Sequence, residues 1–132
     1  MDLYAKLLLE YYNNNIITDN EAAKYFQMSA YKGSPVAMCC YGSLLDLGIG
    51  VKKDQKKALE YFKMSSEFGC TEGIYQYAFH IENGLGCQVD CIKASKYYEI
   101  ASFYGDIKSM VRLGKMLNNG KLPLILINQS NI

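Results

Sequence analysis

The sequence has no tryptophan, one histidine, two prolines and almost no net charge, and these scarcities exclude several functions. Fourteen basic and thirteen acidic residues leave a net charge of +1, too little to hold a nucleic-acid backbone or an anionic membrane surface. No apolar run approaches the roughly 20 residues of a membrane-spanning helix; the longest covers 122–127. We therefore expect neither nucleic-acid binding nor membrane insertion.

The cysteines predict a reducing compartment and no bound cofactor. The start of the chain has neither the basic segment nor the small-residue cleavage site of a secretory signal peptide. Five cysteines without an export signal favour reduced thiols and a cytoplasmic location. No two of the cysteines form a Cys-x-x-Cys pair, and the chain has only one histidine that could serve as a further ligand. We therefore predict no metal or other cofactor site.

The sequence repeats every 36 residues. One shift of 36, without insertions, relates most of the chain to itself, and periods of this length are typical of stacked helical repeats. We therefore expect an all-α solenoid. Identical residues 36 positions apart include Tyr41 and Tyr77, Gly48 and Gly84, Gly50 and Gly86, Asp54 and Asp90, Ala58 and Ala94, and Tyr61 and Tyr97.

Each unit has the pattern of two helices joined by a turn. In the second unit Pro35 suits a first helical turn, and apolar residues then recur at helical spacing. Gly48 and Gly50 predict a turn with positive φ, after which Asp54 is a good N-cap for the second helix. In the first unit the asparagines at 13–15 replace the glycines, and Thr18 or Asp19 caps the second helix.

Small residues at fixed positions predict close contacts between helices. One set lies in the first helices and another in the second helices, and residues without bulk let two helix axes approach. A tyrosine of each second helix is expected to fill the adjacent space. The sets are Gly42, Ala78 and Gly114; Ala22, Ala58 and Ala94; and Tyr25, Tyr61 and Tyr97.

The pattern Gly-x-Gly, Asp, Lys-Ala, an aromatic pair and a final Gly resembles the Sel1-like (SLR) repeat, a relative of the tetratricopeptide repeat. It is most complete from Tyr41 to Gly69 and from Tyr77 to Gly105. The resemblance implies a right-handed α/α superhelix of about seven antiparallel helices. We expect repeats at 1–34 (degenerate), 35–70, 71–106 and 107–120 (partial), then a tail at 121–132; the incomplete last unit favours a piece of a longer array.

The resemblance also implies a non-catalytic scaffold or adaptor that binds a protein or peptide in a concave groove. One side of each first helix would line that groove. Tyr75 and Phe79 would be apolar anchors, and Arg112 and Lys115 would take a carboxylate or a polar backbone. The alternative is that both aromatics pack against neighbouring helices. The expected groove residues are Tyr4, Leu7, Cys39, Cys40, Ser43, Tyr75, Gln76, Phe79, Val111, Arg112 and Lys115.

Other interpretations remain open. A thiol-dependent hydrolase would use Cys91, next to a helix start, or His80. However, His80 falls where sister repeats have apolar residues, which predicts a packing site with a partly wet imidazole, and Cys87 replaces Val51 and is expected in the core. The chain would otherwise be the regulatory repeat region of a larger signalling or quality-control protein. An exposed last helix and the segment 122–127 would permit end-to-end self-association.

Overall fold

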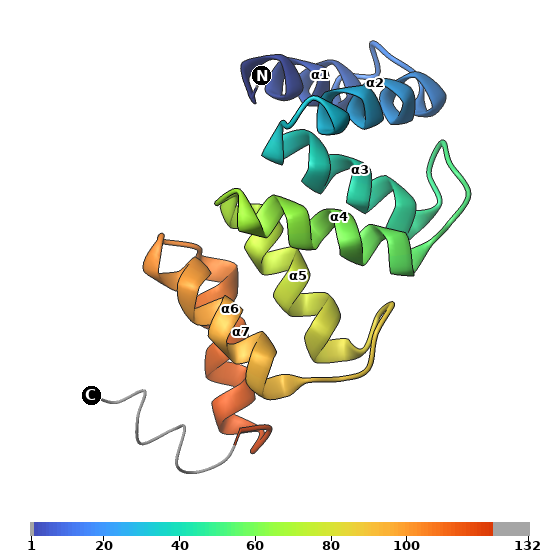
Figure 1. Cartoon of the computed structure of the whole chain (residues 1–132). Coiled ribbons are helices and arrows are strands. Elements are labelled where there is room, and N and C mark those ends of the chain that lie inside the picture. Colours follow the sequence, from blue (N-terminus) through green and yellow to red (C-terminus); the bar gives the residue numbers. More distant parts are fainter. Residues whose placement is uncertain (1, 123–132) are drawn as a thin grey trace.

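The computed structural model describes residues 2–122, and all regular structure among them is helical (Figure 1). This confirms the predicted all-α solenoid. No helix in that part of the chain has the length and apolar character needed to cross a membrane. The predicted tail lies, from residue 123, outside the described residues. The helices are α1 (Asp2–Asn13), α2 (Asp19–Tyr31), α3 (Pro35–Leu47), α4 (Gln55–Glu67), α5 (Thr71–Asn83), α6 (Cys91–Phe103) and α7 (Ile107–Asn118).

The helices stack in chain order, from α1 and α2 at one end to α6 and α7 at the other (Figure 1). Each helix packs against the next one along the chain. First helices of successive hairpins also meet, α1 with α3 and α3 with α5. Contacts are therefore local in sequence, as expected for a solenoid.

Polar caps and glycines fix the helix boundaries that the sequence predicted. Asp54 and Asp90 accept hydrogen bonds from the amides of Lys57 and Lys93, each at 3.0 Å, and so begin α4 and α6. Thr18, the N-cap of α2, forms a reciprocal capping box with Glu21. Gly48 and Gly84 end α3 and α5 in the left-handed conformation, and Asn15, at φ 59°, takes a glycine's role after α1.

The packing contacts of the core recur with the 36-residue period of the sequence. Ala22, Ala58 and Ala94 are fully buried in the second helices, as the predicted close contacts between helices require. The adjacent tyrosines form the same edge-to-face pair in two successive hairpins. Centroid separations are 4.9 Å for both Tyr41–Tyr61 and Tyr77–Tyr97, and the interplanar angles are 86° and 85°.

The packing role predicted for Gly114 is wrong. At the equivalent position Gly42 is buried, and a Cβ there would lie 2.8 Å from the Phe62 ring, while Ala78 is fully enclosed. Gly114 is exposed, and a Cβ built on it would meet nothing within 4 Å. The reason is that the described residues contain no helix after α7 that would pack on this position.

The second glycine of each turn packs against the preceding hairpin. A Cβ on Gly50 would lie 2.3 Å from the carbonyl oxygen of Asp19, at the start of α2. A Cβ on Gly86 would lie 2.6 Å from the carbonyl oxygen of Gln55, at the start of α4. Both glycines also have positive φ. The repeat thus needs glycine here for backbone conformation and for close approach.

We expect Gly86→Ala to destabilise the protein more than Gly69→Ala. Their φ values, 81° and 82°, carry the same conformational cost, but a Cβ at Gly69 would meet nothing within 4 Å. Left-handed strain costs about 1–2 kcal/mol in either variant, and the backbone clash at Gly86 adds about 1–3 kcal/mol. Urea unfolding followed by circular dichroism measures the loss in free energy of unfolding for each variant. Equal losses would show that the contact between Gly86 and α4 is unimportant.

Candidate functional site

Two aromatic side chains of α5 lie together at the surface of the third hairpin. Tyr75 and Phe79 are four residues apart and therefore share one side of the helix. Their ring centroids are 6.2 Å apart with an interplanar angle of 28°, and both side chains are partly exposed. Together with Glu72 of α5 and Lys108 and Arg112 of α7, they form what we call the aromatic face.

Cations from α7 cover both rings. The Lys108 Nζ lies 4.6 Å from the centre of the Tyr75 ring, and the Arg112 Cζ lies 5.2 Å from the centre of the Phe79 ring. The face of an aromatic ring attracts a cation, with a contribution of about 0.5–1 kcal/mol at exposed sites. The cations therefore help to hold α7 alongside α5 and fix the position of the two rings.

Glu82 is the charged anchor beneath this face. Only 4% of it is exposed, and it accepts hydrogen bonds from Arg112 Nη2 at 2.8 Å, Lys121 Nζ at 2.9 Å and the Tyr98 hydroxyl at 2.8 Å. Burial acts to raise the pKa of Glu82, but these three donors outweigh it and hold the pKa below its ordinary value. Glu82 therefore joins α5, α6 and α7 as a buried, paired carboxylate.

The ion pair between Glu72 and Lys108 was missed by our reading of the sequence, although a signal for it exists. The two residues are 36 positions apart, so they occupy equivalent places on neighbouring first helices. Opposite charges at such places predict a pair across the junction. The carboxylate of Glu82 has no comparable signal, because its partners come from three different parts of the repeat.

Of the residues expected on α5 and α7, Tyr75, Phe79, Gln76 and Arg112 lie at the aromatic face or contact it. Gln76 donates to Glu72 Oε1 at 3.1 Å. Arg112, expected to receive a partner's carboxylate, already pairs with Glu82 of its own chain. Lys115 is exposed farther along α7. The roles assigned to them in partner binding stay predictions.

The residues expected on α1 and α3 do not join this face. Tyr4 and Leu7 are exposed on α1, at the far end of the stack. Ser43 is partly buried and donates to the carbonyl oxygen of Cys39 at 3.1 Å. Cys39, expected to line an exposed groove, is 5% exposed and belongs to the core, because α3 packs directly against α5 at this point.

The two interpretations of the aromatics both describe part of the structure. Tyr75 packs against the core, with its ring centroid 5.9 Å from that of buried Tyr98. Phe79 is partly exposed and contacts Arg112. Tyr75 thus packs against the core and is also partly exposed, whereas Phe79 lies at the surface outside the core.

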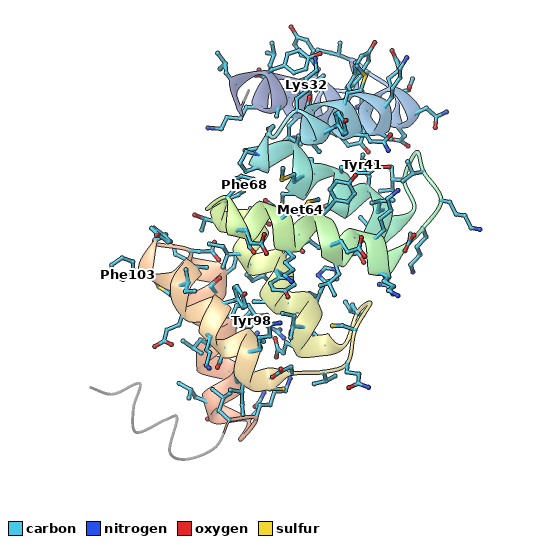
Figure 2. All side chains as sticks on the ribbon, viewed as in Figure 1. Lys32, Tyr41, Met64, Phe68, Tyr98 and Phe103 are labelled. Carbon is cyan, nitrogen blue, oxygen red and sulfur yellow. The ribbon has the colours of Figure 1, made fainter. Side chains whose placement is uncertain are left out.

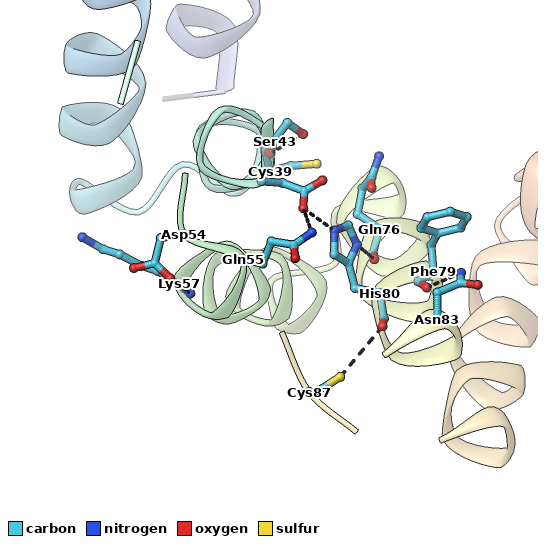
Figure 3. Close-up of polar contacts among 11 residues, drawn as sticks. Cys39, Ser43, Asp54, Gln55, Lys57, Gln76, Phe79, His80, Asn83 and Cys87 are labelled. Atoms are coloured by element: carbon cyan, nitrogen blue, oxygen red, sulfur yellow. Dashed lines mark hydrogen bonds and ion pairs between the residues drawn. The ribbon is translucent and has the colours of Figure 1, made fainter. Parts of the chain in front are cut away.

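His80 occupies a buried polar site between helices (Figure 3). Its Nδ1 lies 2.7 Å from the carbonyl oxygen of Gln76, and its Nε2 lies 3.2 Å from Asp46 Oδ1. Asp46 also accepts from Gln55 at 3.0 Å, and the Phe62 ring centroid lies 4.8 Å from that of the imidazole. The predicted packing role is confirmed, but the predicted wetness is wrong because only 2% of His80 is exposed.

The remaining thiol predictions have mixed outcomes. Cys87 is exposed, not a core residue, because it lies in the loop after Gly86, where its Sγ is 3.8 Å from the carbonyl oxygen of His80. Cys91 begins α6 and is partly buried, and its reactivity stays a prediction. Within residues 2–122, no cluster of three or more His, Cys, Asp or Glu side chains is arranged to hold a metal ion.

We expect Glu82→Gln to lower stability at neutral pH by about 1–3 kcal/mol, because it weakens three charge-assisted hydrogen bonds. Since folding lowers the pKa of Glu82, its stabilising effect is complete above the unfolded-chain pKa of about 4.3 and is lost as pH falls through the lower, folded-state pKa. The difference in free energy of unfolding between Glu82→Gln and wild type should therefore become smaller below about pH 4.

Urea unfolding at several pH values measures this gap. Glu72→Gln is the matched control, because its carboxylate pairs with Lys108 at the exposed surface and its loss costs less than about 1 kcal/mol. A gap for Glu82→Gln that is the same at pH 7 and pH 3.5 would contradict the assigned ionisation.

Solved structures with the same fold come from several bacteria. The chain matches c5321, a protective antigen of uropathogenic Escherichia coli displaying an SLR fold, with TM-score 0.81 and 27% identity over 88% of this chain and 25% of that chain. It therefore spans about a quarter of the antigen's length. A Sel1 repeat protein of Oxalobacter formigenes matches with TM-score 0.73 and 28% identity over 83% and 84% of the two chains. Helicobacter pylori cysteine rich protein B matches with TM-score 0.74 and 22% identity over 80% of each.

A sequence model of the Sel1 repeat matches most of the chain, whereas no curated protein sequence matches it. The matched residues are 19–34, 35–69, 71–102 and 107–128. The second range contains the hairpin α3–α4, and the third covers the hairpin α5–α6 except for its last residue; the glycine turns, caps and buried alanines described above recur in both. The chain belongs to the Sel1 repeat family.

Proposed function

We propose that the protein is a non-catalytic scaffold that binds a segment of a partner protein at the aromatic face. Sel1 repeats in general mediate protein–protein interactions. The observation that carries the proposal is the pair Tyr75 and Phe79, which stay partly exposed although α5 lies in the middle of the stack. Aromatic rings of this kind are frequent hot spots of protein interfaces.

The rings are held in place before any partner binds. Lys108 and Arg112 cover one ring each, and both cations are tied to carboxylates of α5. A side chain that is already fixed loses little rotamer freedom on binding, which favours affinity. An apolar side chain of the partner would contact Phe79, and polar groups of its backbone would reach Gln76.

Lys115 is an exposed cation of α7 that forms no ion pair among the described residues. It would attract an acidic residue of the partner at the rim, where a charge acts mainly on the association rate. We also place the scaffold in the cytoplasm. Support comes from the five cysteines, all of which are free thiols in the structure.

We expect Phe79→Ala to weaken binding of a partner segment at least tenfold, which corresponds to about 1.4 kcal/mol. Peptides selected from a random library on the wild-type protein serve as the ligands. Their dissociation constants are then measured by calorimetry with wild type and variants. Phe79 lies outside the core, so its truncation should leave the fold intact; Tyr75→Ala,Phe79→Ala removes both anchors and should abolish binding.

The matched control is Phe103→Ala,Tyr104→Ala. These residues form an exposed aromatic pair at the end of α6, with ring centroids 5.7 Å apart and 87% and 65% exposure. Figure 2 shows Phe103 at that end of α6. The control should retain wild-type affinity. Unchanged binding by a folded Tyr75→Ala,Phe79→Ala variant, or equal loss in the control, would exclude the aromatic face as the binding site.

End-to-end association is a second candidate function, favoured by the outer side of α7. Ile107, Met110 and Val111 are exposed there by 72%, 46% and 49%. In a solenoid, the next hairpin covers the corresponding side of each inner helix. We expect the mass measured by light scattering to rise with concentration and Met110→Glu to abolish the rise. A strictly monomeric wild type at millimolar concentration would exclude this association.

A further inference from the structure

A cavity rich in lysine lies beside the turn that joins α3 to α4. Its volume is about 310 Å³, at the lower end of the roughly 300–1,000 Å³ that is typical of small-molecule sites. Helix α3 contributes two of the lining side chains, and the turn and the first residues of α4 contribute the others. The lining residues are Tyr41, Leu45, Val51, Lys52, Lys53, Asp54 and Lys57.

The backbone of the turn fixes the position of these lysines. The amide of Asp54 donates to the carbonyl oxygen of Leu45 at 2.9 Å, which holds the end of the turn against α3. Gly48 lies against the stem of Lys53, since a Cβ on Gly48 would be 3.0 Å from Lys53 Cβ. Asp54 then begins α4 by accepting from the amide of Lys57. The cavity is therefore formed by well-defined backbone and not by a loose loop.

The charges around the cavity are mainly positive. Its three lysines are exposed and form no ion pair among residues 2–122. Asp54 is the single carboxylate in the lining, and its side chain already accepts a hydrogen bond at the start of α4. Three positive charges and one negative charge leave an excess of two positive charges, which favours an anion in this cavity.

Tyr41 adds a buried hydroxyl that has no partner. The side chain extends from α3 and packs edge to face on Tyr61 of α4, and only 3% of the residue is exposed (Figure 2). The hydroxyl makes no hydrogen bond to any residue that the structure describes, although most buried polar groups have a partner. Burial raises the pKa of Tyr41, so the hydroxyl stays protonated at neutral pH and can donate. A ligand in the cavity would supply the acceptor.

We propose that this cavity, which we call the lysine pocket, binds the phosphate group of a small soluble phosphate monoester. Such a group carries a charge of about −1.5 to −2 at neutral pH and presents three acceptor oxygens. The lysines act on these oxygens as point charges, and the Tyr41 hydroxyl donates a directed hydrogen bond. A carboxylate, with a single charge, would leave part of the lining uncompensated. The organic part of the ester would lie against Leu45 and Val51.

The lysines belong to one turn and not to the repeat pattern. The positions equivalent to Lys53 carry Ile17 and Val89, and those equivalent to Lys52 carry no cation either. Val89 contacts the glycine of its own turn as Lys53 does, so packing at this position is satisfied by an apolar residue. A nucleic acid, whose phosphates continue along its length, would need cations on successive turns. A single small ligand is therefore favoured.

The lysine pocket is separate from the aromatic face. The pocket lies on the α3–α4 hairpin, whereas the aromatic face is formed by α5 and α7. The proposal therefore does not depend on a partner at the aromatic face, and each can fail without the other.

The first test titrates the isotopically labelled full chain with glycerol 3-phosphate and, separately, with inorganic phosphate, at an ionic strength held constant with sodium chloride. Nuclear magnetic resonance should show saturable shifts of the amide signals at 51–57 with both ligands. Shifts that do not saturate with glycerol 3-phosphate, or that spread evenly over all helices, would overturn the proposal.

The second test compares two variants that lose the same charge. Lys52→Gln,Lys53→Gln should weaken binding of glycerol 3-phosphate by about tenfold or more, because it removes two of the cations around the phosphate. Lys56→Gln,Lys63→Gln changes exposed lysines of α4 outside the cavity and should retain wild-type affinity. Equal weakening in both variants would show attraction to the overall charge and would overturn the pocket.

The third test removes only the Tyr41 hydroxyl. Tyr41→Phe keeps the ring contact with Tyr61 and should remain folded, which circular dichroism checks. We expect binding of glycerol 3-phosphate to weaken about threefold or more. Tyr77→Phe, at the equivalent position of the next hairpin, is the matched control and should bind as wild type does. Unchanged affinity in Tyr41→Phe would overturn the donor role of the hydroxyl.

A lipid headgroup is the other source of such a phosphate, and sedimentation with vesicles distinguishes the two. Phosphatidic acid carries the same glycerol phosphate group as the soluble probe. The chain should stay in the supernatant of phosphatidylcholine vesicles with or without phosphatidic acid. Sedimentation with phosphatidic acid vesicles, without binding of glycerol 3-phosphate in solution, would assign the pocket to a membrane and overturn the soluble ligand.

Discussion

The structure depends on the close approach of successive helices at positions that carry no bulk. Ala22, Ala58 and Ala94 are fully enclosed, and each lies 36 residues from the next. Glycines at the turns let each hairpin rest on the backbone of the one before. Because the three hairpins that contain these alanines are buried in this same way, side chains outside these contacts are free to differ between repeats. The candidate functional residues are found among them.

The junctions between first helices are not equivalent, and the difference explains where the candidate sites lie. At the α3–α5 junction the helices pack closely, and short side chains meet directly, as Asp46 meets His80. Between α5 and α7 the contacts run through long charged side chains, with Glu82 paired to Arg112. Long side chains leave space beside them, so Phe79 stays at the surface. The closely packed α3–α5 junction thus encloses polar groups such as His80, whereas the α5–α7 junction, which is connected by long side chains, presents a face for binding.

The sequence was sufficient to predict the helices and turns of the backbone, but it was insufficient to predict the contacts and burial of several side chains. A residue and its counterpart 36 positions away share a backbone environment, so caps such as Asp54 and turns such as Gly48 could be predicted. A side chain's partner comes from a neighbouring hairpin, however, and the period does not specify it. The burial of His80 against Asp46 and the exposure of Cys87 were missed for this reason. At the candidate face, Tyr75, Phe79 and Arg112 could be selected by position, but the contacts of Lys108 with the Tyr75 ring and of Arg112 with the Phe79 ring could not.

Comparison between repeats nevertheless separates structural requirements from local chemistry. Positions 34, 70 and 106 begin three equivalent helices, so the backbone amides available to Ser34, Cys70 and Asp106 are alike. Only the side chain differs: Ser34 and Asp106 each accept a hydrogen bond from an amide of the first helical turn, so the repeat fixes the backbone of a helix start and leaves its side chain free to vary.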